Sequence, residues 1–246
     1  MSKSKVRLDT PQQKEIYNNF RYLSDRYGKW ETWSDFIRLS ACSLCVSDRD
    51  EREREYVDTI KRYRQEDIER FPRMFALTVD ALEQNPYQDF LGDLFMRFDL
   101  PNTRKGQFFT PYCICEAMSS LMAGDLTIRL KNEPWISVND LACGAGALLI
   151  AFAQECRQQK VNYQQSVLFV AQDIDRTAAL MCFVQLSLLG CAGYVVVGDS
   201  LLNPTVGPSV LLPVKQDGQE IWYTPMMYTE IWQYRLALEK IKNIPQ

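Results

Sequence analysis

The chain has 246 residues, 46% of them apolar and 24% charged, a length that suits one α/β domain with an appendage. Its formal net charge of −3 argues against strong autonomous binding of duplex DNA, which usually needs a basic face. Histidine is absent, which excludes a Ser-His-Asp triad, a Cys-His pair and any histidine-ligated metal. No apolar run approaches the roughly 20 residues of a membrane span, so no membrane segment is predicted. No apolar run follows the basic start Met1–Lys5, so no secretory signal is predicted either. We therefore predict a cytoplasmic protein whose eight cysteines stay reduced.

The first hundred residues show the pattern of successive helices. Thr10 and Pro11 form a helix start, because the hydroxyl can cap the helix and proline is tolerated in its first turn. Apolar residues then recur at helical spacing. Helices are predicted to begin near Thr10, Trp33, Ser47, Phe71 and Phe90. No β-branched run interrupts them, so residues 1–100 are predicted to form an all-helical N-terminal domain.

Four cysteines raise the question of a metal site. Cys42-x-x-Cys45 and Cys113-x-Cys115 together contain the thiols of a four-cysteine zinc site. Their spacing fits no zinc ribbon, and Cys42 and Cys45 fall in a predicted amphipathic helix. Helix packing is therefore favoured, and no metal site is predicted.

After Pro101 short apolar strands alternate with helices. Strands are predicted at residues 136–139, 167–171 and 194–197, and helices at residues 147–158 and 177–189. This alternation indicates a parallel sheet with right-handed crossovers. Residues 101–246 are predicted to form the second domain, which would hold the functional site.

A glycine turn follows the first predicted strand. Gly144 and Gly146 stand in a run of small residues between that strand and an apolar helix, where a ligand can touch the backbone. Leu149 replaces the third glycine of a dinucleotide fingerprint, and no Gly-Lys-Ser/Thr follows for a triphosphate. A ligand with an adenosine but no pyrophosphate is therefore favoured.

Each of the three predicted strands ends at an acidic residue: Asp140, Asp173 and Asp199. In a parallel sheet these ends line one rim. At that rim Asp140 can pair with a ligand ammonium and Asp173 can accept hydrogen bonds from ribose hydroxyls. Asp199 can accept a hydrogen bond from an adenine amino group. For any one acid, capping of the following helix is the simpler interpretation. The series of three beside the glycine turn predicts binding of S-adenosylmethionine.

The segment Lys105-Gly106-Gln107-Phe108-Phe109-Thr110-Pro111 resembles the Gly-Gln-Phe-Tyr/Phe-Thr-Pro signature of adenine-N6 DNA methyltransferases. The chain is similar to the modification subunits of type I restriction systems in particular. Residues 140–146, 172–175 and 198–201 resemble three further elements of the family in the same order. The likeness implies a Rossmann-like fold of S-adenosylmethionine-dependent methyltransferases.

The resemblance assigns a role to each matching position. Residues 108–110 would touch the methionine end of the cofactor, Asp173 the ribose, and Ile174 the adenine. The cofactor-binding residues that it implies are Phe108, Phe109, Thr110, Asp140, Ala142, Gly144, Gly146, Asp173, Ile174, Asp199 and Ser200.

One element of the family is missing. The Asn/Asp-Pro-Pro-Tyr/Phe motif, which binds the target amino group and stacks on a flipped base, is absent. The nearest equivalent by position is Trp222-Tyr223-Thr224-Pro225, so Tyr223, Thr224 and Pro225 are the candidate catalytic residues. About 20 residues follow Pro225, too few for a complete methyltransferase sheet. We therefore expect a truncated sheet, as in the compact methylase-like proteins of mobile elements that the ending resembles.

Aromatic residues crowd the end of the chain: Trp222, Tyr223, Tyr228, Trp232 and Tyr234. Packing of a final helix over the sheet edge is the favoured interpretation. A base-stacking platform or a dimer surface is the alternative.

These observations leave three hypotheses open. The first is an S-adenosylmethionine-binding DNA adenine-N6 methyltransferase, acting on DNA alone or with a partner subunit, as in restriction-modification. The second is a catalytically inactive regulatory or partner subunit that binds cofactor, DNA or both, as part of a homo- or hetero-oligomer. The third is a methyltransferase for another acceptor.

Overall fold

Helices make up the first part of the chain in the computed structural model, which describes residues 6–100 and 109–243. They are α1 (Pro11–Tyr27), α2 (Lys29–Leu44), α3 (Arg49–Ile60), α4 (Gln65–Ile68), α5 (Arg70–Gln84) and α6 (Phe90–Arg97). At the start of α1 the Thr10 hydroxyl accepts a hydrogen bond from the Gln13 backbone at 3.2 Å, and the Gln13 side chain accepts one from the Thr10 backbone. This reciprocal cap fixes the helix start. The predicted helical N-terminal region is confirmed.

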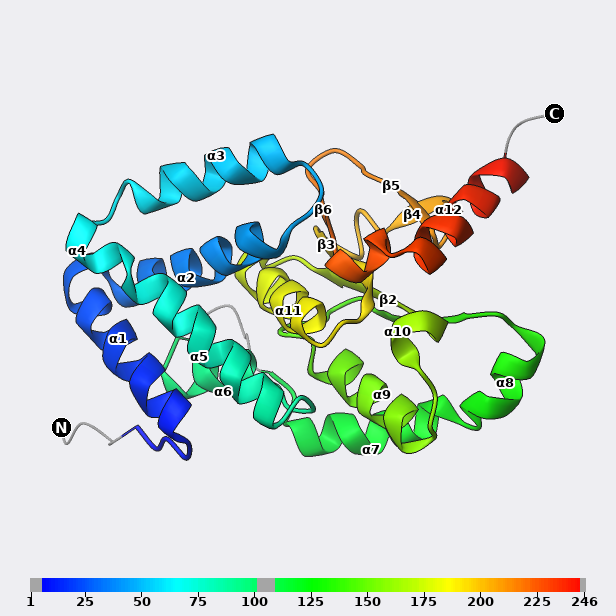
Figure 1. Cartoon of the computed structure of the whole chain (residues 1–246), viewed down its shortest axis with the longest axis horizontal. Helices are drawn as coiled ribbons and strands as arrows, with labels where there is room; N and C mark the ends of the chain where they lie inside the picture. Colours follow the sequence, from blue (N-terminus) through cyan, green and yellow to red (C-terminus); the bar gives the residue numbers. More distant parts are fainter. Residues whose placement is uncertain (1–5, 101–108, 244–246) are drawn as a thin grey trace.

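Four strands form the main sheet, in the order β1-β2-β3-β6 (Figure 1). They are β1 (Ile136–Asp140), β2 (Val167–Asp173), β3 (Ala192–Val197) and β6 (Glu220–Tyr223). The first three are parallel, as predicted, and each pair is joined by a helical crossover. β6 runs antiparallel to β3, with Tyr223 opposite Tyr194. Within the described chain, β1 is therefore one edge of the sheet and β6 is the other.

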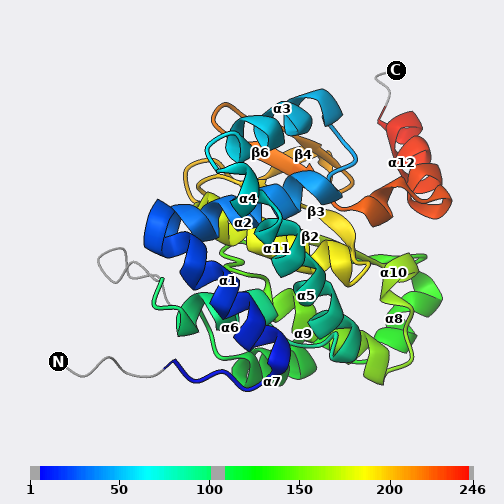
Figure 2. The same ribbon diagram turned by 60° about the vertical axis from the view of Figure 1, so that its left-hand side comes forward.

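The two faces of the sheet are covered differently (Figures 1 and 2). α9 (Ala147–Gln158) and α11 (Arg176–Leu188) pack on the face that carries Phe169, Val195 and Trp222. The other face carries Val170 and Tyr194. It is covered by the hairpin of β4 (Val206–Ser209) and β5 (Leu212–Val214), the 3₁₀ turn η2 (Pro225–Tyr228) and α12 (Glu230–Lys242). Three further helices complete the second half: α7 (Tyr112–Ala123), α8 (Leu126–Asn132) and α10 (Tyr163–Ser166).

One apolar core runs through the predicted domain boundary at residue 100. It contains Phe36 and Leu91 from the helical region together with Phe183 of α11 and Trp222 of β6. Figures 1 and 2 both show α2 lying beside α11. The division at residue 100 stays a prediction, while the shared core joins the helices to the sheet.

Charged side chains reinforce this junction. Arg176 of α11 donates to both carboxylate oxygens of Glu220 at 2.7 and 3.0 Å and contacts Glu55 of α3 at 2.8 Å. The guanidinium of Arg52 lies 3.8 Å from the ring centroid of Trp222, a cation–π contact. The charges of α3 thus hold β6 against the helical region.

Two tryptophans at the end of the chain are fully buried, Trp222 on one face of the sheet and Trp232 of α12 on the other. Tyr228 and Tyr234 are exposed. The predicted packing of a final helix on the sheet is therefore confirmed for Trp232, whereas Trp222 packs against Phe183 of α11 on the opposite face. In the part of the chain that the structure describes, no helix is both long and apolar enough to span a membrane.

Candidate functional site

The glycine turn between β1 and α9 is shaped by two glycines with positive φ, 53° at Gly144 and 96° at Gly146. A Cβ added at Gly146 would lie 2.8 Å from the Sγ atom of Cys182 in α11, closer than packed atoms tolerate. A Cβ added at Gly144 would lie 3.1 Å from the ring of Phe109, which covers the turn from outside. Both positions need glycine for backbone conformation and for close approach.

Two of the three predicted carboxylates converge on this turn. Asp140 Oδ1 accepts a hydrogen bond from the Ala142 backbone at 3.1 Å. Asp173, at the end of the neighbouring strand, accepts from the Gly144 backbone at 2.8 Å through one oxygen and from the Asp175 backbone at 2.8 Å through the other. A carboxylate has about four acceptor positions, so both side chains keep capacity for a ligand. Burial raises the pKa of each carboxyl group, because the charged form loses hydration.

A cavity of about 180 Å³ opens beside the turn. Its lining is Asp89, Phe109, Thr110, Cys115, Met118, Asp140, Ala142, Cys143, Gly144, Ala145, Ala147 and Leu148. Of the predicted cofactor residues, it brings together Phe109, Thr110, Asp140, Ala142 and Gly144. Ligand pockets usually exceed about 300 Å³, so the cavity suits only one end of a nucleoside-sized ligand.

The remaining predicted cofactor residues lie on the rim or elsewhere. Ile174 follows Asp173 and is 70% exposed, so its side chain is free to pack against a flat ring. Asp199 Oδ1 accepts hydrogen bonds from the Leu201 and Leu202 backbones at 2.8 and 3.0 Å, so it caps its own turn. Neither Asp199 nor its neighbour Ser200 lines the cavity. Phe108 lies outside the described residues.

The predicted catalytic residues are not brought to this rim. Tyr223 ends β6 and Thr224 follows it, and β6 is three strands away from β1, about 14 Å at the usual strand spacing. The Thr224 side chain is fully buried, accepts from the Gly193 backbone at 3.0 Å and donates to the Cys191 carbonyl at 2.7 Å. Pro225 begins the turn η2. The structure thus places these three residues at the far edge of the sheet, where Thr224 joins β6 to β3.

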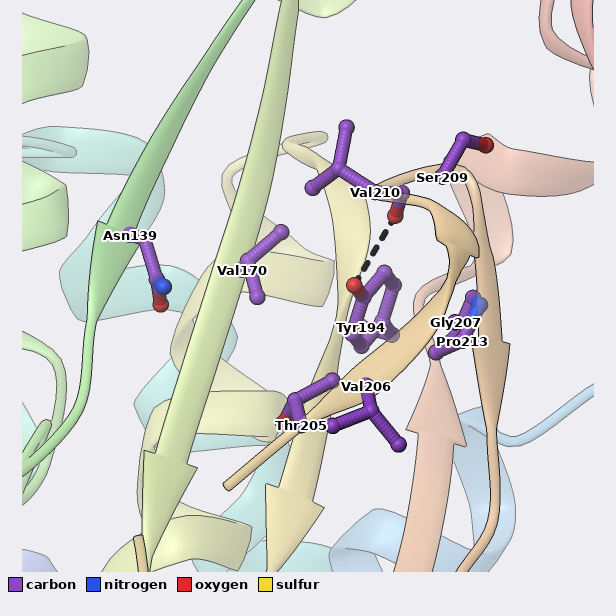
Figure 3. Close-up of a pocket in the computed structure, with 9 residues that line it drawn as sticks. All are labelled: Asn139, Val170, Tyr194, Thr205, Val206, Gly207, Ser209, Val210 and Pro213. Atoms are coloured by element: carbon purple, nitrogen blue, oxygen red, sulfur yellow. Dashed lines mark hydrogen bonds between the residues drawn. The ribbon is translucent and has the colours of Figure 1, made fainter.

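A larger cavity, of about 350 Å³, lies on the opposite face of the sheet. Figure 3 shows Asn139, Val170 and Tyr194 on three neighbouring strands, facing the segment that carries Thr205 and the β4–β5 hairpin. The Tyr194 hydroxyl donates to the Val210 carbonyl at 2.9 Å, which ties the hairpin to the sheet. None of the predicted site residues lines this cavity.

Asp89 is not among the predicted site residues. It precedes α6 in the helical region and reaches the cavity beside the glycine turn. In the sequence it carries only the signal of a helix cap, and its approach to the turn depends on the packing of α6 against α11.

Of the four cysteines considered for zinc, Cys42 lies in α2 and Cys45 directly follows it, whereas Cys113 and Cys115 lie in α7. Across residues 6–100 and 109–243, no group of three or more potential metal-binding side chains is present.

Comparison with known protein families gives a match to a family described as N-6 DNA Methylase over residues 88–220, more than half of the chain. The matched stretch begins beside Asp89, contains the glycine turn and Asp173, and ends in β6. No curated protein and no solved structure gives a significant match.

Proposed function

The chain belongs to the N-6 DNA methylase family, and from this premise we propose that it binds S-adenosylmethionine at the glycine turn and transfers its methyl group to the amino nitrogen of adenine in DNA. The observation that carries the proposal is the convergence of Asp140 and Asp173 on the turn, beside a cavity without lysine or arginine in its described lining. We also assign the sheet to the Rossmann-like methyltransferase fold, which the parallel order β1-β2-β3 supports.

The residues present fit this cofactor by charge and shape. The amino-acid end would lie in the cavity, with its ammonium group near Asp140 and with Phe109 and Thr110 at the wall. The nucleoside would lie on the open rim, where Asp173 can accept from ribose hydroxyls and the exposed Ile174 can pack on adenine. Gly144, which lines the cavity, carries no side chain that would stand between the turn and the ligand.

The cofactor supplies an electrophilic methyl group on sulfur, so the protein needs no covalent nucleophile. The role of this chain is to hold two reactants in line and to exclude other geometries, which lowers the entropic part of the barrier. The absence of histidine is consistent with such a reaction, because the proton of the methylated amino group can pass to solvent or to a carboxylate.

A second candidate function is a cofactor-binding subunit that does not catalyse transfer itself. The position of Thr224 favours it, because the hydroxyl is fully buried and engaged with backbone groups about 14 Å from β1. In that case a partner subunit, or another copy of the chain, would supply the residues that bind the target base and DNA. Eight free thiols support a cytoplasmic location for either form.

Calorimetric titration with S-adenosylmethionine tests the cofactor assignment. We expect heat of binding for the parent chain and at least tenfold weaker binding for Asp173→Ala. No binding by the parent chain would overturn the proposal. Transfer of labelled methyl groups to adenine in DNA, lost in Asp140→Ala, would favour the enzyme over the non-catalytic subunit. Cofactor binding without transfer would favour the subunit.

A further inference from the structure

Asp89 presents a buried carboxylate to the cavity beside the glycine turn. The residue is 9% exposed. Both hydrogen bonds that it accepts from described residues go to Oδ1, from the Gly92 backbone at 3.0 Å and from Gln185 Nε2 at 2.8 Å. Oδ2 therefore has no hydrogen-bond donor among the described residues, although the side chain lines the cavity.

The carboxylate is held rigidly in this position. Gln185 of α11 is 1% exposed, and its amide nitrogen donates to Asp89 Oδ1 and to the Ala145 carbonyl of the turn, both at 2.8 Å. Its amide oxygen accepts from the Leu91 backbone at 3.0 Å. A Cβ at Gly92 would lie 2.1 Å from Asp89 Oδ2, so only glycine leaves room for the carboxylate there. The helical region, α11 and the glycine turn thus meet at one acidic side chain.

The cavity consequently contains two carboxylates, Asp89 and Asp140, and no lysine or arginine among its described lining residues. Two like charges on buried and half-buried side chains favour the entry of a cation between them. Burial also raises the pKa of the Asp89 carboxyl group, as expected for an acid without a cationic partner. A ligand with a positively charged end would offset the repulsion between the two carboxylates and stabilise their charged forms.

We propose that Asp89 is a cofactor-binding residue, whose charge makes the cavity selective for the positively charged methionine end of S-adenosylmethionine. This inference rests on the proposed function. It adds that the helical region completes the cofactor site. It also predicts preference for the sulfonium over the neutral thioether of S-adenosylhomocysteine, because the two ligands differ by one positive charge.

The variant Asp89→Asn tests the charge alone. Asparagine has nearly the same shape, and its amide oxygen can accept from Gly92 and Gln185 in the same way. Calorimetry would compare three ligands that carry decreasing positive charge: S-adenosylmethionine, S-adenosylhomocysteine and 5′-methylthioadenosine. Relative to the parent, we expect the affinity of Asp89→Asn to fall at least tenfold for S-adenosylmethionine, by a smaller factor for S-adenosylhomocysteine, and less than twofold for 5′-methylthioadenosine.

Asp93→Asn is the matched control. Asp93 lies four residues further along α6, pairs with Arg97 at 2.7 Å and does not line the cavity. We expect it to leave all three affinities unchanged. Thermal unfolding of each variant would verify that it is folded.

The outcomes separate the two levels of the proposal. If the parent chain does not bind S-adenosylmethionine, the proposed function fails. If the parent chain binds S-adenosylmethionine and Asp89→Asn binds each of the three ligands as tightly as the parent does, the inference about Asp89 fails while the proposed function stands. An equal loss for all three ligands would indicate a structural role and would also overturn the inference.

Discussion

Gly146→Ala should destabilise the fold through the turn that builds the site. Gly146 has φ 96°, a region that side-chain-bearing residues rarely adopt. Forcing alanine there costs roughly 1–3 kcal/mol. The added Cβ would also lie 2.8 Å from Cys182 Sγ, where overpacking adds about 1–3 kcal/mol. The free energy of unfolding should therefore fall by about 2–6 kcal/mol, a large part of the roughly 5–15 kcal/mol of a typical domain.

Two further variants separate these contributions. Gly218 also has positive φ, 79°, but a Cβ there would meet nothing within 4 Å, so Gly218→Ala carries the backbone strain alone. In the double variant with Cys182→Ala the nearest clash is removed, and the remaining neighbours lie at an ordinary 3.4 Å. Urea unfolding should give a coupling of about 1–2 kcal/mol between positions 146 and 182.

Contact between the turn and α11 would not explain why position 146 needs glycine if Gly146→Ala destabilised the protein no more than Gly218→Ala. The same conclusion would follow if Cys182→Ala left the effect of Gly146→Ala unchanged.

Two further predictions concern the strand ends. Burial raises the pKa of Asp140 above its unfolded value of about 4, so ionisation of Asp140 destabilises the ligand-free fold as pH rises above that value. Asp140→Asn should therefore raise the melting temperature at pH 7 and should match the parent below about pH 4. Asp89 and Asp173 are present in both the variant and the parent, so their titration affects both proteins alike. A difference in melting temperature that persists at low pH would therefore argue against the charge of Asp140 as the cause. Thr224→Val leaves the Gly193 donor and the Cys191 acceptor without partners and should lower the free energy of unfolding by about 1–3 kcal/mol in denaturant titration, with affinity for S-adenosylmethionine unchanged. Weaker cofactor binding with unchanged stability would restore a site role for Thr224.

The sequence by itself determined the local elements and the turn. Apolar periodicity marks the helices before residue 100, because burial of one helix face requires that spacing. Short continuous apolar runs mark β2 and β3, because both faces of these parallel strands are buried. The convergence of Asp140 and Asp173 could also be foreseen, since the carboxyl ends of neighbouring parallel strands share one rim. These inferences depend on contacts within an element or between strands joined by one crossover.

Only the tertiary structure decided which distant segments meet. The sequence does not specify which sheet edge β6 joins, and β6 pairs with β3. Asp89 and Gln185 are 96 residues apart in the chain and share a hydrogen bond. Such pairings follow from how whole helices and strands pack, because a local pattern specifies which face is buried and leaves the partner open.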